Sequence, residues 1–169
     1  HFASYYYSMA ESSSPKKKSI LIVCGGPSAE RGISLNSARS LYDNLDRSRY
    51  ALSLIYFDTK LQPYAISETQ IYSNTPFDFD YLLNRPSAKD RLRKILRLSK
   101  RELMKRFRAA DLVFPAIHGA FGEDGKLQEL LEKAGVKYLG SPPAACRITN
   151  DKYLCEQFIK KHRFFTMPT

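Results

Sequence analysis

Two short glycine-containing loops carry most of the residues in this sequence that could bind a ligand or do chemistry. Residues 118–125 read His-Gly-Ala-Phe-Gly-Glu-Asp-Gly and lie between a short apolar run and a helical pattern. The His118 imidazole can donate to a substrate anion, or it can simply hydrogen-bond at the end of a sheet. Glu123 and Asp124 are expected to cap and charge the start of the next helix. Gln128 is expected to brace this loop or to face the ligand.

The other loop, residues 25–34, reads Gly-Gly-Pro-Ser-Ala-Glu-Arg-Gly-Ile-Ser and follows a short apolar run. Its paired glycines allow a tight turn and close approach of the backbone to a ligand. We expect Ser28 to cap the following helix, so that free N–H groups can meet an anion. Glu30 either complements the helix dipole from the first turn or binds an ammonium group. The spacing differs from the GxGxxG pattern of dinucleotide-binding folds, which argues against that class.

Strands and helices that alternate along the chain must position these loops. The expected strands, all apolar runs, are 19–24, 50–57, 112–117 and 136–140. The expected helices are 29–45, about 92–107, 124–134, a brief one after Pro142, and one from 151 to about 162, capped by Asn150. This order predicts an α/β fold, a Rossmann-like open parallel sheet with helices on both faces. Ligands bind such sheets at the carboxyl ends of the strands, so both loops are expected to face one crevice.

The positive charge of the chain is concentrated in one segment. The net charge is +10, and residues 89–108 hold ten cations against Asp90 and Glu102, or +8. Ten cations on one helix could form a nucleic-acid interface. They could equally form the solvated outer face of a helix whose inner stripe is apolar. No tyrosine interleaves with the run, so we expect a solvated face and no nucleic-acid partner.

Composition and local patterns set the expected boundaries. Residues 1–15 are interpreted as a disordered tail, and Met9 as a native start behind extra residues. Residues 16–145 are expected to form the α/β domain, with an insertion at about 58–108 that holds a short strand at 70–72. Residues 146–169 are expected to begin the linker into a further domain.

Hydrophobic content and cysteine usage define the broad class of the protein. Hydrophobic residues make up 43% of 169, and no apolar run approaches the roughly 20 residues needed to cross a bilayer. Three cysteines without metal-ligand spacing favour reduced thiols in a cytoplasm. We therefore expect a soluble, cytoplasmic protein without a metal site in this chain.

Taken together, the motifs resemble the N-terminal domain of D-alanine–D-alanine ligases, a pre-ATP-grasp domain. The family pattern Gly-Gly-x-Ser-x-Glu with a following Ser is matched by residues 25–34. The pattern His-Gly-x-x-Gly-Glu-Asp-Gly-x-x-Gln is matched in full by residues 118–128. Tyr-x-Gly-Ser at 138–141 and Asp-Lys at 151–152 follow in the family's order. Gly32 departs from the pattern, since many relatives carry a side chain there, and we expect the helix to start later or to fray at this residue.

The resemblance implies an enzyme that joins two D-alanines for peptidoglycan with ATP and Mg²⁺, through an acyl phosphate. It implies that Glu30 holds the ammonium group of the first D-alanine. It places His118 beside that substrate and the acyl phosphate, where an N–H donor can stabilise negative charge. Both residues are thus marked as catalytic, and Ile33, Ser34 and Gly119 as further substrate-binding residues.

The resemblance also bears on cofactors and partners. Lys152 matches a lysine that reaches the ATP phosphates at the border of the next domain. The rest of the ATP and Mg²⁺ site is expected in an ATP-grasp portion beyond this sequence, so the fragment is expected to be inactive alone. Relatives are commonly homodimers through this domain. A related ligase that uses D-lactate or D-serine as the second substrate is the alternative.

Overall fold

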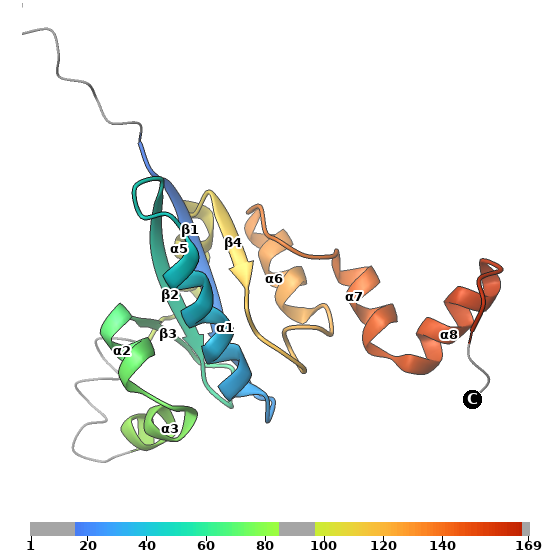
Figure 1. Cartoon of the computed structure of the whole chain (residues 1–169), viewed down its shortest axis with the longest axis horizontal. Coiled ribbons are helices and arrows are strands. Elements are labelled where there is room, and N and C mark those ends of the chain that lie inside the picture. The colour runs from blue at the N-terminus through green and yellow to red at the C-terminus, as the bar shows by residue number, and fades with distance from the viewer. Residues whose placement is uncertain (1–15, 85–96, 167–169) are drawn as a thin grey trace, which may run out of the picture.

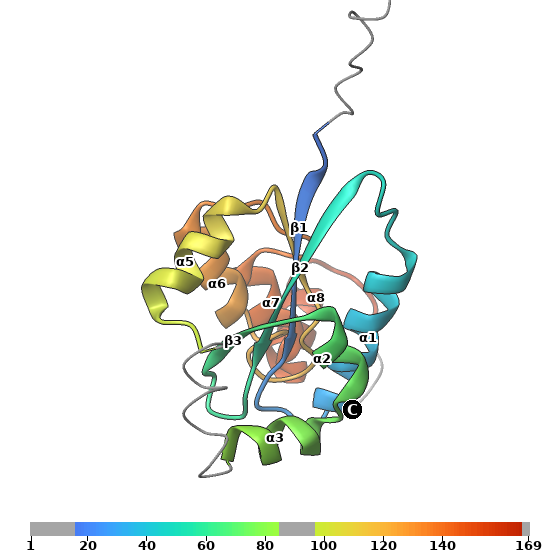
Figure 2. The same ribbon diagram turned by 90° about the vertical axis from the view of Figure 1, so that its left-hand side faces the viewer.

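The computed structural model describes residues 16–84 and 97–166, and it shows a four-stranded sheet with helices on both faces (Figures 1 and 2). The strands are β1 Lys18–Gly25, β2 Tyr50–Phe57, β3 Pro63–Ile66 and β4 Leu112–Pro115. The helices are α1 Arg31–Asn44, α2 Glu68–Ser73, α3 Pro76–Asn84, α5 Lys100–Ala109, α6 Lys126–Ala134, α7 Pro143–Asn150 and α8 Lys152–Lys161. The strand order is β3-β2-β1-β4. The predicted α/β class is confirmed, with one correction: β3 is antiparallel to β2, so the sheet is mixed.

The central strand β1 is buried because both of its faces are apolar. It pairs in parallel with β2 on one side and with β4 on the other. Ile22 and Cys24 belong to the core on one face of the sheet, and Leu21 and Val23 belong to the core on the other. The continuous apolar run therefore fits a strand covered on both sides. The first glycine loop begins directly at the carboxyl end of this strand.

Two separate cores lie on the two faces of the sheet (Figure 2). On one face, Leu35 of α1 packs with Ile71 of α2 and Phe79 of α3. On the other face, Phe107 of α5 packs with Leu127 of α6. α7 and α8 continue from the α6 side and extend away from the sheet (Figure 1). The two faces are therefore covered by different parts of the chain.

The insertion after β2 departs from its predicted structure. The strand predicted at 70–72 is wrong, because these residues belong to α2. The Ser67 side chain accepts from the Gln70 N–H, and the Gln70 side chain accepts from the Ser67 N–H. This reciprocal capping box stabilises a helix start at a place where the apolar pattern is weak. The strand of this stretch is β3 instead.

The basic segment is not one continuous helix in its described part. Arg97 forms a bridge with Tyr64, and the Leu98 N–H donates to the Pro63 carbonyl at 2.8 Å. Ser99 then caps α5, so the helix begins only at residue 100. The inner stripe of α5 is buried, as predicted. Residues 89–96 of the segment lie outside the described residues, as do residues 1–15.

Two further boundaries differ from prediction near the end of the chain. The strand predicted at 136–140 is reduced to a single parallel bridge between Val113 and Tyr138. The cap of α8 is Asp151, whose side chain accepts from the Leu154 N–H, whereas Asn150 is the last residue of α7. The predicted end of the helix at residue 134 is confirmed, and Gly135 follows it in the left-handed region. Within 16–84 and 97–166, no helix has the length and apolar character that crossing a membrane requires.

A carboxylate ties the amino ends of β1 and β4 together and should make stability depend on pH. Asp111 accepts from the Ser19 N–H at 2.7 Å and from the Ser19 hydroxyl at 3.0 Å. These hydrogen bonds lower the pKa of Asp111 below its ordinary value. The stabilisation is therefore complete above the unfolded-state pKa of about 3.9 and is lost as the pH falls through the lower folded-state pKa.

Replacing this carboxylate by an amide should remove that part of the pH dependence. Urea unfolding of the wild type and of Asp111→Asn is expected to differ most near neutral pH. The difference should shrink progressively below about pH 4, because the wild-type carboxylate then becomes neutral as well. If the free energies of unfolding of the two proteins differed by the same amount at every pH in this range, the ionised form of Asp111 would add nothing to stability.

Candidate functional site

The two glycine loops touch each other, and the crevice that the sequence predicted between them stays a prediction. A Cβ placed on Gly119 would lie 2.6 Å from the Ser28 hydroxyl oxygen and 3.1 Å from Glu30 Oε2. Gly119 also has a φ of +71°, which side chains rarely adopt. The glycine therefore lets the backbone of one loop lie against the carboxylate of the other.

The Glu30 carboxylate is exposed and is not used to cap the helix. Glu30 occupies the N-cap position of α1, and its side chain makes no capping hydrogen bond. Ser28 does not cap the helix either, because its hydroxyl accepts from the Glu30 N–H at 3.1 Å. The prediction of a Ser28 cap, with Glu30 in the first helical turn, is thus wrong, because the N-cap is Glu30, two residues later. This arrangement leaves the Glu30 carboxylate available to a cation.

His118 is held between the helix α1 and its own loop. Its Nε2 lies 3.0 Å from the Ser37 hydroxyl, and its Nδ1 lies 3.5 Å from Glu123 Oε1. Glu123 therefore faces the imidazole, and it does not cap α6 as predicted. These two contacts orient the ring. The side chain of His118 is 36% exposed, so a ligand can still reach it.

Ser34 connects the two loops from beneath and is fully buried. Its hydroxyl accepts from the Gly25 N–H at 2.8 Å and donates to the Ala116 carbonyl at 2.7 Å. These bonds join the carboxyl end of β1 to the segment that follows β4. The predicted role of Ser34 in a substrate pocket would then be indirect, through the position of the loops. Its neighbour Ile33 is 54% exposed, beside Glu30 on the same turn.

The second loop is braced by contacts that only small residues allow. A Cβ on Gly122 would lie 2.1 Å from the Ile117 carbonyl oxygen. The buried Gln128 donates from Nε2 to the Gly122 carbonyl at 2.7 Å, which is the bracing role that the sequence suggested. α6 begins at Lys126 and not at Asp124, whose side chain accepts from the Lys126 N–H.

An ion pair that the sequence did not reveal holds the turn that carries Glu30. Arg31 donates from one guanidinium nitrogen to both carboxylate oxygens of Asp80, at 2.8 and 2.9 Å. Hydrogen bonding to Asp80 raises the pKa of Arg31. Asp80 lies on α3, inside an insertion with weak periodicity, so no local pattern indicated this partner. The contact between Ser37 and His118 was also missed, although Ser37 lies one helical turn after Ile33.

Lys152 is not brought to the two loops. It is the exposed first residue of α8, and α8 lies beyond α7 on the side away from the sheet (Figure 1). No group of three His, Cys, Asp or Glu side chains within the described ranges is placed to hold a metal ion. Phosphate binding by Lys152 therefore stays a prediction.

Comparison with known proteins relates this arrangement to one family of enzymes. Residues 19–141 match the family described as the D-ala D-ala ligase N-terminus. The D-alanine–D-alanine ligase of Chloroherpeton thalassium is 35% identical over 142 residues, which are 80% of this chain and 38% of that protein. D-alanine–D-alanine ligase A of Escherichia coli K12 is 31% identical over 150 residues, or 86% of this chain and 41% of that protein. The chain thus spans about two fifths of the length of these relatives.

Solved structures agree with the sequence matches. The D-alanine–D-alanine ligase from Coxiella burnetii has a TM-score of 0.69 at 29% identity, over 86% of this chain and 42% of that chain. The VanG D-Ala:D-Ser ligase from Enterococcus faecalis has a TM-score of 0.68 at 25% identity, over 91% of this chain and 44% of that chain. The family match includes both glycine loops. The chain therefore belongs to the D-alanine–D-alanine ligase family, and residues 19–141 are its N-terminal domain.

Proposed function

We propose that this chain provides the first D-alanine site of an ATP-dependent D-alanine–D-alanine ligase, which makes the dipeptide for peptidoglycan in the cytoplasm. The observation that carries the proposal is the contact between the two loops, with Glu30 Oε2 against the backbone of Gly119. A substrate amino acid is a zwitterion, and one of these loops offers it an exposed carboxylate while the other offers an oriented imidazole.

In the proposed site each end of D-alanine has its own partner. Glu30 binds the ammonium group through a charge-assisted hydrogen bond. Its carboxylate makes no capping hydrogen bond to α1 and is therefore available to the substrate. The D-alanine carboxyl group lies toward His118, whose orientation is fixed by Ser37 and Glu123. An N–H donor held there stabilises the negative charge that develops on the reacting carboxyl oxygen. Ile33 contributes an apolar wall beside the substrate methyl group.

The described residues supply substrate binding but not the phosphoryl-transfer machinery. Phosphoryl transfer depends on positioning and on metal ions, and the described residues include no cluster of three His, Cys, Asp or Glu side chains placed to hold a metal ion. ATP and Mg²⁺ would activate the substrate carboxyl group from sites in the remainder of the full-length enzyme. We therefore propose that the 169-residue chain does not catalyse the reaction by itself.

Product analysis tests this function directly. The full-length protein that carries this domain is expected to form D-alanyl-D-alanine and to release phosphate when given D-alanine, ATP and Mg²⁺. The 169-residue chain is expected to release none under the same conditions. Turnover by the isolated chain would overturn its proposed inactivity, and a full-length protein that forms no dipeptide or related product would overturn the ligase itself.

A second amino acid other than D-alanine is the alternative within the family. The likeness to the VanG D-Ala:D-Ser ligase favours keeping D-serine as a candidate second substrate. The mass of the product formed by the full-length protein from a mixture of D-alanine, D-serine and D-lactate distinguishes these ligases. We expect the D-alanine dipeptide to dominate, and a dominant mixed product would assign the alternative.

A further inference from the structure

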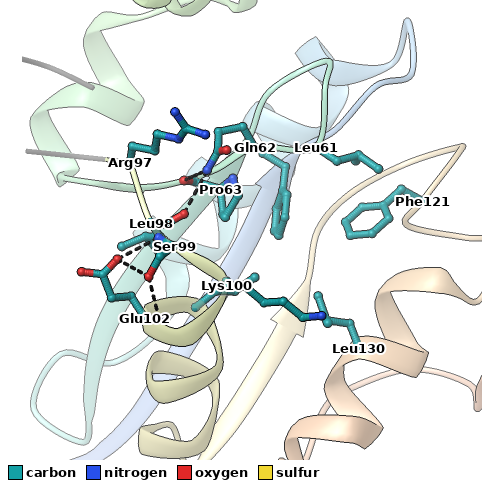
Figure 3. Close-up of a pocket in the computed structure, with 12 residues that line it drawn as sticks. Leu61, Gln62, Pro63, Arg97, Leu98, Ser99, Lys100, Glu102, Phe121 and Leu130 are labelled. Atoms are coloured by element: carbon teal, nitrogen blue, oxygen red, sulfur yellow. Dashed lines mark hydrogen bonds between the residues drawn. The ribbon is translucent and has the colours of Figure 1, made fainter. Parts of the chain in front are cut away.

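A cleft of about 920 Å³ lies on the opposite face of the sheet from α1 (Figure 3). Its walls are the start of α5, the turn between β2 and β3, α6 and the second glycine loop. Phe121 is the residue that this loop contributes to the wall. Neither Glu30 nor His118 lines the cleft, so it is separate from the proposed D-alanine site. Its volume lies in the upper part of the range typical of small-molecule sites.

The floor of the cleft is apolar and includes two aromatic rings. Phe57 and Phe121 lie with their ring centroids 5.1 Å apart and their planes inclined by 55°. Leu98 and Leu103 complete the buried part of this floor. Leu130 of α6 closes one side, as Figure 3 shows. The floor is itself buried, so the apolar surface that an aromatic or branched group can reach is supplied by the side walls, including Leu61, which is 38% exposed.

Two of the residues at the cleft are held in an unfavourable backbone conformation. Within the described residues, only three side-chain-bearing residues have positive φ: Leu61 at 59°, Phe121 at 75° and Arg163 at 62°. Leu61 and Phe121 both line this cleft. Leu61 is moreover 38% exposed, so its position is not explained by burial in the core. The turn between β2 and β3 holds Leu61 in place, since its N–H donates to the Asp58 carbonyl at 3.0 Å.

The mouth of the cleft is positively charged. Arg97 and Lys100 are exposed there, and neither takes part in any ion pair found among the described residues. Lys100 extends toward Leu130, whereas Glu102 folds back onto Ser99 (Figure 3). The Glu102 carboxylate accepts from the Ser99 N–H and hydroxyl within the helix cap. These hydrogen bonds lower the pKa of Glu102. Within the part of the chain that the structure describes, no carboxylate therefore competes with an outside anion for these two cations.

We propose that this cleft binds an amphipathic anion, with a body of one or two aromatic ring systems and a single acidic group. The rings lie against Leu61 and Leu130, above the buried Phe57 and Phe121, and the acidic group meets Arg97 and Lys100. The charge of the mouth selects an anion over a neutral apolar molecule. Because the proposal depends on this cleft alone, its failure would leave the proposed ligase function untouched.

Anilinonaphthalene sulfonate has this chemistry and reports binding by its fluorescence. The 169-residue chain is expected to bind it saturably. Arg97→Glu combined with Lys100→Glu should weaken the binding about tenfold, since two attractive charges become repulsive. Arg101→Glu combined with Lys105→Glu is the matched control, with the same change in net charge on exposed residues of α5 outside the cleft. It should change the affinity less than about twofold.

Equal weakening by both pairs would show nonspecific attraction to a basic surface and overturn the proposal. Absence of saturable binding by the wild type would overturn it as well. The neutral analogue phenylnaphthylamine should bind more weakly and respond to neither pair.

A measurement on the wild type locates the probe without any substitution. The methyl NMR signals of Leu61 and Leu130 are expected to shift on binding, because both side chains line the cleft. Leu154 on α8 is also exposed and serves as the internal comparison. A shift confined to Leu154 would place the probe on α8 and overturn the proposed site.

Discussion

Gly122→Ala is expected to lower the free energy of unfolding by about 3 kcal/mol. A Cβ at this position would lie 2.1 Å from the Ile117 carbonyl oxygen, and that atom belongs to the backbone and cannot rotate away. The loop would have to shift, which would also disturb the hydrogen bond from Gln128 to the Gly122 carbonyl. Urea unfolding followed by circular dichroism measures the change. The His118 ring signals should move in the same variant, because its loop is displaced.

Gly32→Ala is the matched control for this substitution. Its Cβ would meet only Pro76 Cγ, at 3.9 Å, which is an ordinary contact. Gly32 lies in the first turn of α1, where alanine should stabilise the folded chain by about 0.5 kcal/mol. A loss of less than 1 kcal/mol for Gly122→Ala, or equal losses for both variants, would show that the close approach at Gly122 is not decisive.

The parts of the fold that could be predicted are those specified by local sequence. β1 is an uninterrupted apolar run, and the glycines after it fix where the strand must turn. The second loop was equally clear, because its glycines and acids stand between a strand and a helical pattern. Even so, the start of α1 was misplaced by two residues. A serine hydroxyl can cap a helix or close a short turn, and the residue type of Ser28 does not distinguish these uses.

The contacts that escaped prediction join residues far apart in the chain. Arg31 and Asp80 are separated by 49 positions, and Ser34 and Ala116 by 82. Nothing near Ser34 indicates burial, because its burial follows from the segment after β4 that lies across it. The two loops were therefore predictable from local sequence, while the hydrogen bonds that hold them depend on the assembled sheet.

In the full-length enzyme, Glu30→Gln is expected to reduce kcat/KM for the first D-alanine about 100-fold, equivalent to about 2.7 kcal/mol. The amide keeps the size of the side chain but removes the charge that opposes the substrate ammonium group, and hydrogen bonds to charged groups contribute about 1.5–3 kcal/mol. Initial rates measured against D-alanine, fitted with separate constants for the two substrate positions, give this value.

The same variant should leave the fold intact, because the Glu30 side chain makes no capping hydrogen bond in α1. Its unfolding midpoint is therefore expected to match the wild type, which separates a lost substrate contact from a damaged domain. Glu132→Gln removes the same charge from an exposed position on α6 and should change kcat/KM less than about twofold. If Glu30→Gln lost less than threefold, or lost activity only together with stability, Glu30 would not be the partner of the ammonium group. The contact between the two loops would then have to serve the fold alone.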